Sequence, residues 1–148
     1  METEIIRFNL LSPLCYVPEE NPNPFGCREG SGEKLFCFEL DEDQYSSFEP
    51  DMQKLLKSLV FGGDAVTGEG KGDGKTVFQL PGGNYLFAQK REILKKEEII
   101  ALAVEIQLEG LWQRLLPGKM LYLRYLFEDG RPVTQLFRPY HRKGESGA

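Results

Sequence analysis

The stretch KMLYLRYLFEDGRPVTQLFRPY, residues 119–140, decides the fold that the sequence predicts. Two runs rich in aromatic and apolar residues flank the pair Asp129-Gly130. An Asp-Gly pair favours a tight connection between strands, because both residues tolerate positive φ angles. The stretch therefore predicts a β-hairpin. If the loop is Asp129-Gly130-Arg131, one face of the hairpin would carry Leu121, Leu123, Tyr125, Phe127, Val133 and Phe137.

A long helix is predicted just before the hairpin, in LKKEEIIALAVEIQLEGLWQRLL, residues 94–116. Its apolar residues recur at helical spacing and form a wide arc. One stripe holds Ile99, Leu102, Ala103 and Ile106, and its neighbour holds Ile100, Val104, Leu108, Leu111 and Leu115. We expect this arc to lie on a sheet, with Pro117-Gly118 ending the helix.

The remaining regular elements are predicted from shorter patterns. Alternating or β-branched runs predict strands over residues 5–11, 34–40, 76–80 and 84–90. Pro81-Gly82-Gly83 is either a tight turn between two strands or a kink within one long strand. A first helix is expected over residues 48–61, where apolar residues stand at helical spacing, and Gly62-Gly63 should end it.

Two loops separate these elements. Residues 17–33 are rich in Pro, Asn and Gly, and long loops of this kind in compact domains are often functional, so this one is a candidate lid. The stretch GEGKGDGKT, residues 68–76, suggests a phosphate-binding loop, but the first glycine of that motif falls on Glu69. It is also followed by a strand-like run instead of a helix. We interpret residues 62–74, which are rich in glycine and include most of this stretch, as a flexible loop that joins a helix to a strand.

Composition narrows the class of protein. At 148 residues the chain is predicted to form one domain, residues 1–148, with a disordered tail over residues 141–148. A net charge of −5 and a pI near 5.0 argue against direct nucleic-acid binding. No apolar run of eighteen residues or signal peptide is recognised. The three cysteines lack C-x-x-C spacing and suit a reducing compartment, so we expect a cytoplasmic protein without a membrane partner.

The second half of the chain resembles a known family. The matching segments are LPGGNYLFAQ (residues 80–89), YLRYLFEDG (122–130) and TQLFRPY (134–140). In their order they resemble the GyrI-like small-molecule-binding domains, which also serve as effector modules of some transcription activators. The resemblance implies a GyrI-like, SHS2-type fold and a small-molecule ligand. Relatives that bind cationic drugs have a glutamate next to the tyrosine of the strand before the last turn. Here Leu123 and Arg124 stand beside Tyr125, so the expected ligand is planar or apolar.

Five aromatic residues are the candidate ligand-binding residues: Tyr85, Phe87, Trp112, Tyr122 and Tyr125. Aromatic side chains form rigid apolar walls, and the polar atoms of Tyr and Trp can orient a ligand. The alternative is that the same side chains fill the core between helix and sheet.

Catalysis and metal binding have less support. Glu105 shares a helix face with Glu109, and Glu98 lies two turns before it, which would suit acid–base chemistry or simply a solvated helix face. Because some GyrI-like relatives hydrolyse strained electrophiles with a pocket glutamate, the resemblance keeps Glu105 as a candidate catalytic residue. A single histidine, His141, and widely spaced cysteines imply no metal, and no cofactor motif is present.

Together these patterns predict an α+β domain: an antiparallel or mixed sheet with two main helices on one face and a concave opposite face. The leading function is binding of a planar or apolar small molecule without catalysis. Two alternatives stay open. The first is a protein–protein interaction module or homodimer, and the second is a small hydrolase of reactive electrophiles.

Overall fold

The computed structural model describes residues 5–10, 14–18, 33–40, 57–65, 78–80 and 82–142. The elements, in chain order, are β1 (Ile5–Leu10), β2 (Leu14–Pro18), β3 (Lys34–Glu39), β4 (Leu59–Ala65), β5 (Phe78–Leu80), β6 (Gly83–Lys90), α3 (Lys96–Trp112), β7 (Leu115–Pro117), β8 (Met120–Glu128) and β9 (Arg131–Arg142).

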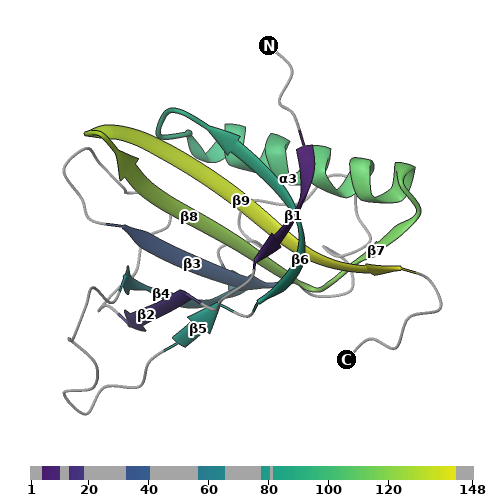
Figure 1. Ribbon diagram of the computed structural model, residues 1–148, viewed down its shortest axis with the longest axis horizontal. Coiled ribbons are helices and arrows are strands. Elements are labelled where there is room, and N and C mark those ends of the chain that lie inside the picture. Colours follow the sequence, from purple (N-terminus) through teal and green to yellow (C-terminus); the bar gives the residue numbers. More distant parts are fainter. Residues whose placement is uncertain are drawn as a thin grey trace.

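Most of the described chain belongs to one antiparallel sheet. Its strand order is β1-β6-β9-β8-β3-β4-β2-β5, and β7 pairs with the end of β9. The sheet is strongly twisted, and α3 lies along one of its faces (Figure 1). The helix contacts β6, β7, β9 and β1.

The prediction of two main helices on one face was wrong. Within the described ranges α3 is the only complete helix, and the fold is mainly an antiparallel sheet. Residues 48–56 of the expected first helix lie outside the described residues, but its last residues, Leu59 to Phe61, begin strand β4. Their half-buried, exposed, half-buried sequence is the alternation of a strand with one buried face.

Gly62-Gly63 continues this strand, although it was expected to end a helix. A Cβ atom on Gly63 would lie 2.1 Å from the Val17 carbonyl oxygen of the neighbouring strand β2. The glycine is therefore required for close approach of two backbones within the sheet.

The hairpin prediction is confirmed, and its register corrects the expected faces. Asp129 and Gly130 both have positive φ, 52° and 76°, and Glu128 pairs directly with Arg131. The loop thus has two residues and not three. A shift of one residue turns every side chain of a strand to the other face of the sheet. Val133 and Phe137 therefore lie on the face of Tyr122, and not on the face of Leu121 as expected.

Of the two connections expected at Pro-Gly-Gly, the pairing favours the kink within one long strand, although Pro81 itself lies outside the described residues. Strand β5 pairs with β2 and β6 pairs with β1, so the flanking strands pair with successive strands of the chain and not with each other. The chain passes here between distant positions in the strand order. Gly83, with φ 140°, occupies a conformation that favours glycine.

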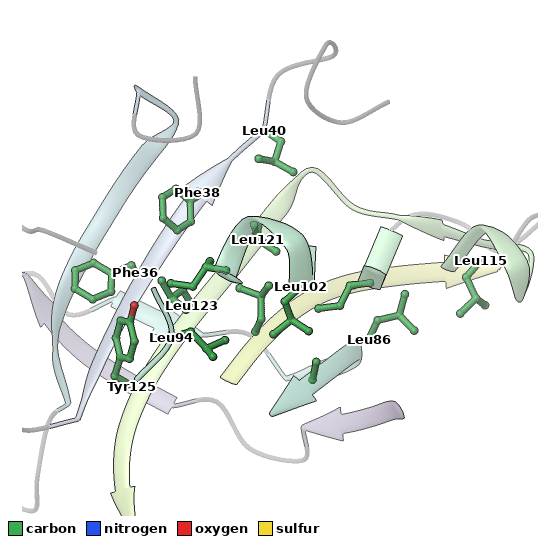
Figure 2. Close-up of a cluster of buried hydrophobic side chains, with 14 residues drawn as sticks. Phe36, Phe38, Leu40, Leu86, Leu94, Leu102, Leu115, Leu121, Leu123 and Tyr125 are labelled. Carbon is green, nitrogen blue, oxygen red and sulfur yellow. The ribbon is translucent and has the colours of Figure 1, made fainter. Parts of the chain in front are cut away.

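Two buried clusters lie on opposite faces of the sheet. The helix-side cluster lies between the sheet and α3, and Figure 2 shows Leu102 of the helix among side chains of the strands. It consists of Phe36, Phe38, Leu40, Leu86, Ala88, Leu94, Ile99, Leu102, Ile106, Leu115, Leu121, Leu123, Tyr125 and Leu136. The aromatic cluster consists of Tyr16, Leu35, Cys37, Leu80, Tyr85, Tyr122 and Phe137.

Other expectations concern the chain ends, the loops and the membrane. Strand β9 extends to Arg142, so His141 and Arg142 are part of it, while residues 143–148 lie outside the described residues. Residues 19–32 and 68–76 also lie outside them. In the part of the chain that the structure describes, no helix is long and apolar enough to cross a membrane.

Candidate functional site

The five aromatic residues predicted to bind a ligand lie in three different places. Tyr85, Phe87 and Tyr122 gather in or against the aromatic cluster. Tyr125 belongs to the helix-side cluster, since it is three residues from Tyr122 along strand β8 and points to the opposite face. Trp112 is the last residue of α3, and its side chain is 85 % exposed. The structure therefore brings three of the five together.

The aromatic cluster is closely packed. The ring of Tyr85 lies 6.0 Å from that of Tyr122 and 5.9 Å from that of Phe137, and Phe87 lies 5.1 Å from Phe137. All three contacts are edge-to-face, the arrangement that aromatic pairs prefer. Tyr85 is 2 % exposed and Tyr122 is 4 % exposed. These side chains hold the face of the sheet together, and a ligand-binding role for them stays a prediction.

Burial changes the acidity of this cluster. It raises the pKa of Tyr85 to about 12, with the nearby Cys37 as a second cause. Burial also raises the pKa of the Tyr122 phenol and of the Cys37 thiol above their ordinary values. A buried phenolate or thiolate is poorly solvated, so all three groups stay neutral near pH 7.

Tyr125 is packed in the same manner on the other face. Its ring lies 6.0 Å from that of Phe36, edge to face, and its side chain is buried. The sheet itself separates it from Tyr122, so these two tyrosines cannot line one pocket.

A polar row crosses the sheet on the side of the aromatic cluster. The Arg124 Nε and Nη2 atoms donate to Glu33 Oε2 over 3.1 and 3.0 Å, and its Nη1 donates to Gln135 Oε1 over 3.0 Å. The Tyr16 hydroxyl donates to the same Glu33 oxygen over 2.6 Å, and Gln135 Nε2 donates to Gln89 Oε1 over 2.7 Å. Each nitrogen of the guanidinium thereby donates one hydrogen bond within the protein.

Sequence reasoning noticed Arg124 but missed its partners. Glu33 lies 91 residues earlier in the chain, at the end of a stretch read as a loop, and Tyr16 lies in the unpredicted strand β2. The one available signal was a charged residue at an inward position of an aromatic strand, which requires a counter-charge.

Glu105, the candidate catalytic residue, is exposed on α3. The other two glutamates already have hydrogen-bond partners: Glu98 accepts a hydrogen bond from the Lys95 backbone N–H at the start of the helix, and Glu109 accepts one from the Gln113 side chain. In the described ranges no three His, Cys, Asp or Glu side chains are grouped so that they could hold a metal ion.

The most unusual surface is the side of α3 that faces away from the sheet. Leu108 and Leu111 are each 47 % exposed, and Trp112 follows directly. Together with the exposed Ala101 and the half-buried Val104 they form the outer stripe of the helix. Positions 101, 104, 108 and 111 are spaced three, four and three residues apart, which places them along one line of an α-helix.

The opposite side of the same helix explains why it packs on the sheet. Ile99, Leu102 and Ile106 are buried in the helix-side cluster, and this set is the inner stripe. Apolar residues therefore lie on two sides of α3, and the inner stripe is the side that packs on the sheet. The outer stripe is apolar without being covered by any described residue of the sheet.

The comparisons with known proteins give no lead. No protein-family model matches the chain, and no curated protein matches it. The resemblance to GyrI-like domains thus stays a prediction.

Proposed function

We propose that the protein is an interaction module that docks a partner protein through the outer stripe of α3. The observation that supports it is the exposure of Trp112, Leu108 and Leu111 side by side on one regular element. Single exposed apolar residues are common, but contiguous apolar patches on a soluble domain mark interaction sites. Tryptophan is also among the residues that contribute most to protein–protein affinity.

The helix that carries the outer stripe is held firmly against the sheet. Gly110 faces strand β6, where an added Cβ would lie 3.0 Å from Leu86 Cδ1, so helix and sheet approach closely. After Trp112 the chain turns through Arg114, with φ 59°, into β7, which pairs with β9. A surface held in this way loses little conformational freedom on binding, which favours affinity.

The other two functions have weaker support. Four of the aromatic residues expected to enclose a small molecule lie in or against the two buried clusters, and Trp112 lies apart from them on the surface. Glu105 is exposed on α3, and its acidic neighbours Glu98 and Glu109 have hydrogen-bond partners within the helix region. We also infer a cytoplasmic location, in keeping with the free thiols of Cys15 and Cys37.

A selection from a displayed library of helical peptides tests the proposal. The protein is immobilised, and enriched peptides are measured against wild type, Leu108→Asp, Trp112→Asp and Val60→Asp. Val60 is the matched control, because it is 56 % exposed and lies on β4, away from α3. A buried interface anchor is commonly worth a factor of about ten or more in Kd.

We expect enriched peptides to lose about tenfold or more in affinity with Leu108→Asp and Trp112→Asp, and to be unaffected by Val60→Asp. Thermal denaturation of each variant would verify that the fold is kept. Peptides that bind all four proteins equally would show that the stripe is not the docking surface.

A further inference from the structure

The charged residues beside the outer stripe indicate what kind of partner would bind there. This inference rests on the proposed function. With 3.6 residues per turn, Glu98, Glu105 and Glu109 fall along one side of the stripe, and we call this set the acidic flank. The residues along its other side are Lys96, Ile100, Ala103 and Gln107, and Glu97 stands on the line of the stripe, four residues before Ala101. Acidic residues thus predominate on one side of the apolar stripe, and the other side carries one lysine at the start of the helix.

We propose that the partner is a basic amphipathic helix of another protein, with its apolar seam on the outer stripe and its lysines or arginines facing the acidic flank. The three-four-three spacing of the stripe is the spacing with which one helix packs against another in a coiled coil, because it presents a straight apolar seam. A partner strand, with its two-residue repeat, would match this spacing poorly.

A second copy of the chain fits less well. Two α3 helices packed antiparallel would bring the acidic flank of one against that of the other, and such like-charge contacts oppose pairing. The net charge of −5 adds a longer-range repulsion between copies and an attraction toward a basic partner.

A lipid surface also fits less well. Helices that lie on membranes carry lysines and arginines on the polar side of the apolar face, where they meet anionic headgroups. On α3 the corresponding positions hold Glu105 and Glu109.

The acidic flank would also set the orientation of the partner helix on the stripe. Glu105 is exposed at the middle of the flank, between Val104 and Ile106, and forms no ion pair with any described residue. It is therefore available to a cation from outside. Because three acidic side chains lie along one side and a lysine stands on the other, they would fix which way round the partner helix lies.

Three synthetic peptides test the inference. Each peptide has three heptads and contains no tryptophan. The first has a leucine seam with lysines on its flanks, and the second has the same seam with glutamates on its flanks. The third has serines in place of the seam leucines and keeps the lysine flanks. Trp112 is the one tryptophan of the chain, so its fluorescence reports binding at the stripe directly.

We expect the lysine-flanked leucine peptide to bind about tenfold or more tightly than the glutamate-flanked one at low salt. The difference should shrink in about 0.5 M salt, because exposed charges are then screened. Glu105→Lys should remove most of the difference. Glu92→Lys, an exposed site before the helix that changes the net charge equally, should leave it in place.

The remaining outcomes each decide a different point. Equal binding of both leucine peptides would overturn the basic partner while leaving the interaction surface standing, and stronger binding of the glutamate peptide would do the same. Binding of the serine peptide as well, or of none of the three, would overturn both proposals. Sedimentation showing a dimer that Leu108→Asp dissociates would identify a second copy as the occupant and overturn the basic helix.

Discussion

Tyr122 and Trp112 were predicted to line one pocket, and they lie in opposite environments. Tyr122 is buried in the aromatic cluster, in edge-to-face contact with Tyr85, whereas Trp112 is almost fully exposed at the end of α3. Both residues stand in apolar sequence surroundings. The difference shows that aromatic content alone does not distinguish a residue that completes the core from one that is left exposed on the surface.

The comparison implies a division of roles. We expect the aromatic cluster to contribute to the stability of the sheet, and the exposed residues of the outer stripe to contribute little to it. Substitutions in the two regions should therefore affect different measurements, stability in the first and binding in the second.

The largest effect is expected for Tyr122→Ala. It empties a large buried aromatic site, which commonly costs about 3–5 kcal/mol of unfolding free energy. Urea denaturation measures this loss. A loss under about 1 kcal/mol would show that Tyr122 lines an open pocket after all, and would restore the small-molecule prediction.

Ile106→Ala should follow closely, with a loss of about 2–5 kcal/mol, because Ile106 is fully buried between α3 and the sheet. This prediction compares a buried and an exposed position of the same helix, because Leu108 is only two residues from Ile106. If Ile106→Ala and Leu108→Ala destabilise the protein equally in the same denaturation experiment, inner and outer stripes are not distinct.

The aromatic cluster should also make the protein sensitive to alkali. The pKa of Tyr85 is about 12 in the folded protein and about 10 when unfolded. The folded state therefore holds its proton more tightly, and the stability present below pH 10 is lost as the pH rises toward 12.

Denaturation midpoints measured from pH 8 to 12 would reveal this slope. Tyr85→Phe should make the slope shallower without abolishing it, since the pKa of Tyr122 is raised by burial as well. An unchanged slope would mean that Tyr85 is not sealed from solvent.

The smallest effect on stability is expected for Trp112→Ala. An exposed residue with few packing contacts changes the unfolding free energy by about 0.5 kcal/mol or less, and alanine is a slightly better helix former. The melting temperature and the unfolding free energy from urea denaturation should both equal the wild-type values. A clear destabilisation would show that Trp112 is covered by the rest of the protein.

Part of this picture was accessible from the sequence. Asp129-Gly130 located the hairpin, and the helical repeat located α3 to within a few residues of its observed bounds, Lys96–Trp112. Both signals are local, because they depend on turn conformation and side-chain period. The register was missed, since a two-residue and a three-residue loop are equally compatible with Asp-Gly-Arg.

Long-range features were not accessible. Strand β2 and the Glu33–Arg124 pair depend on residues far apart in the chain, and Leu59 to Phe61 continue a helical pattern yet form a strand through pairing with β3. The outer stripe was visible as part of a wide apolar arc. Which half of the arc meets the sheet is decided by packing, so the exposed half was wrongly expected to be covered.

The central claim is that Leu108 belongs to a binding surface and not to the core. The most direct test measures, on one sample of Leu108→Ala, both the melting temperature and the Kd for the lysine-flanked peptide. We predict an unchanged melting temperature and a Kd that rises about tenfold. A lower melting temperature with an unchanged Kd would contradict the account.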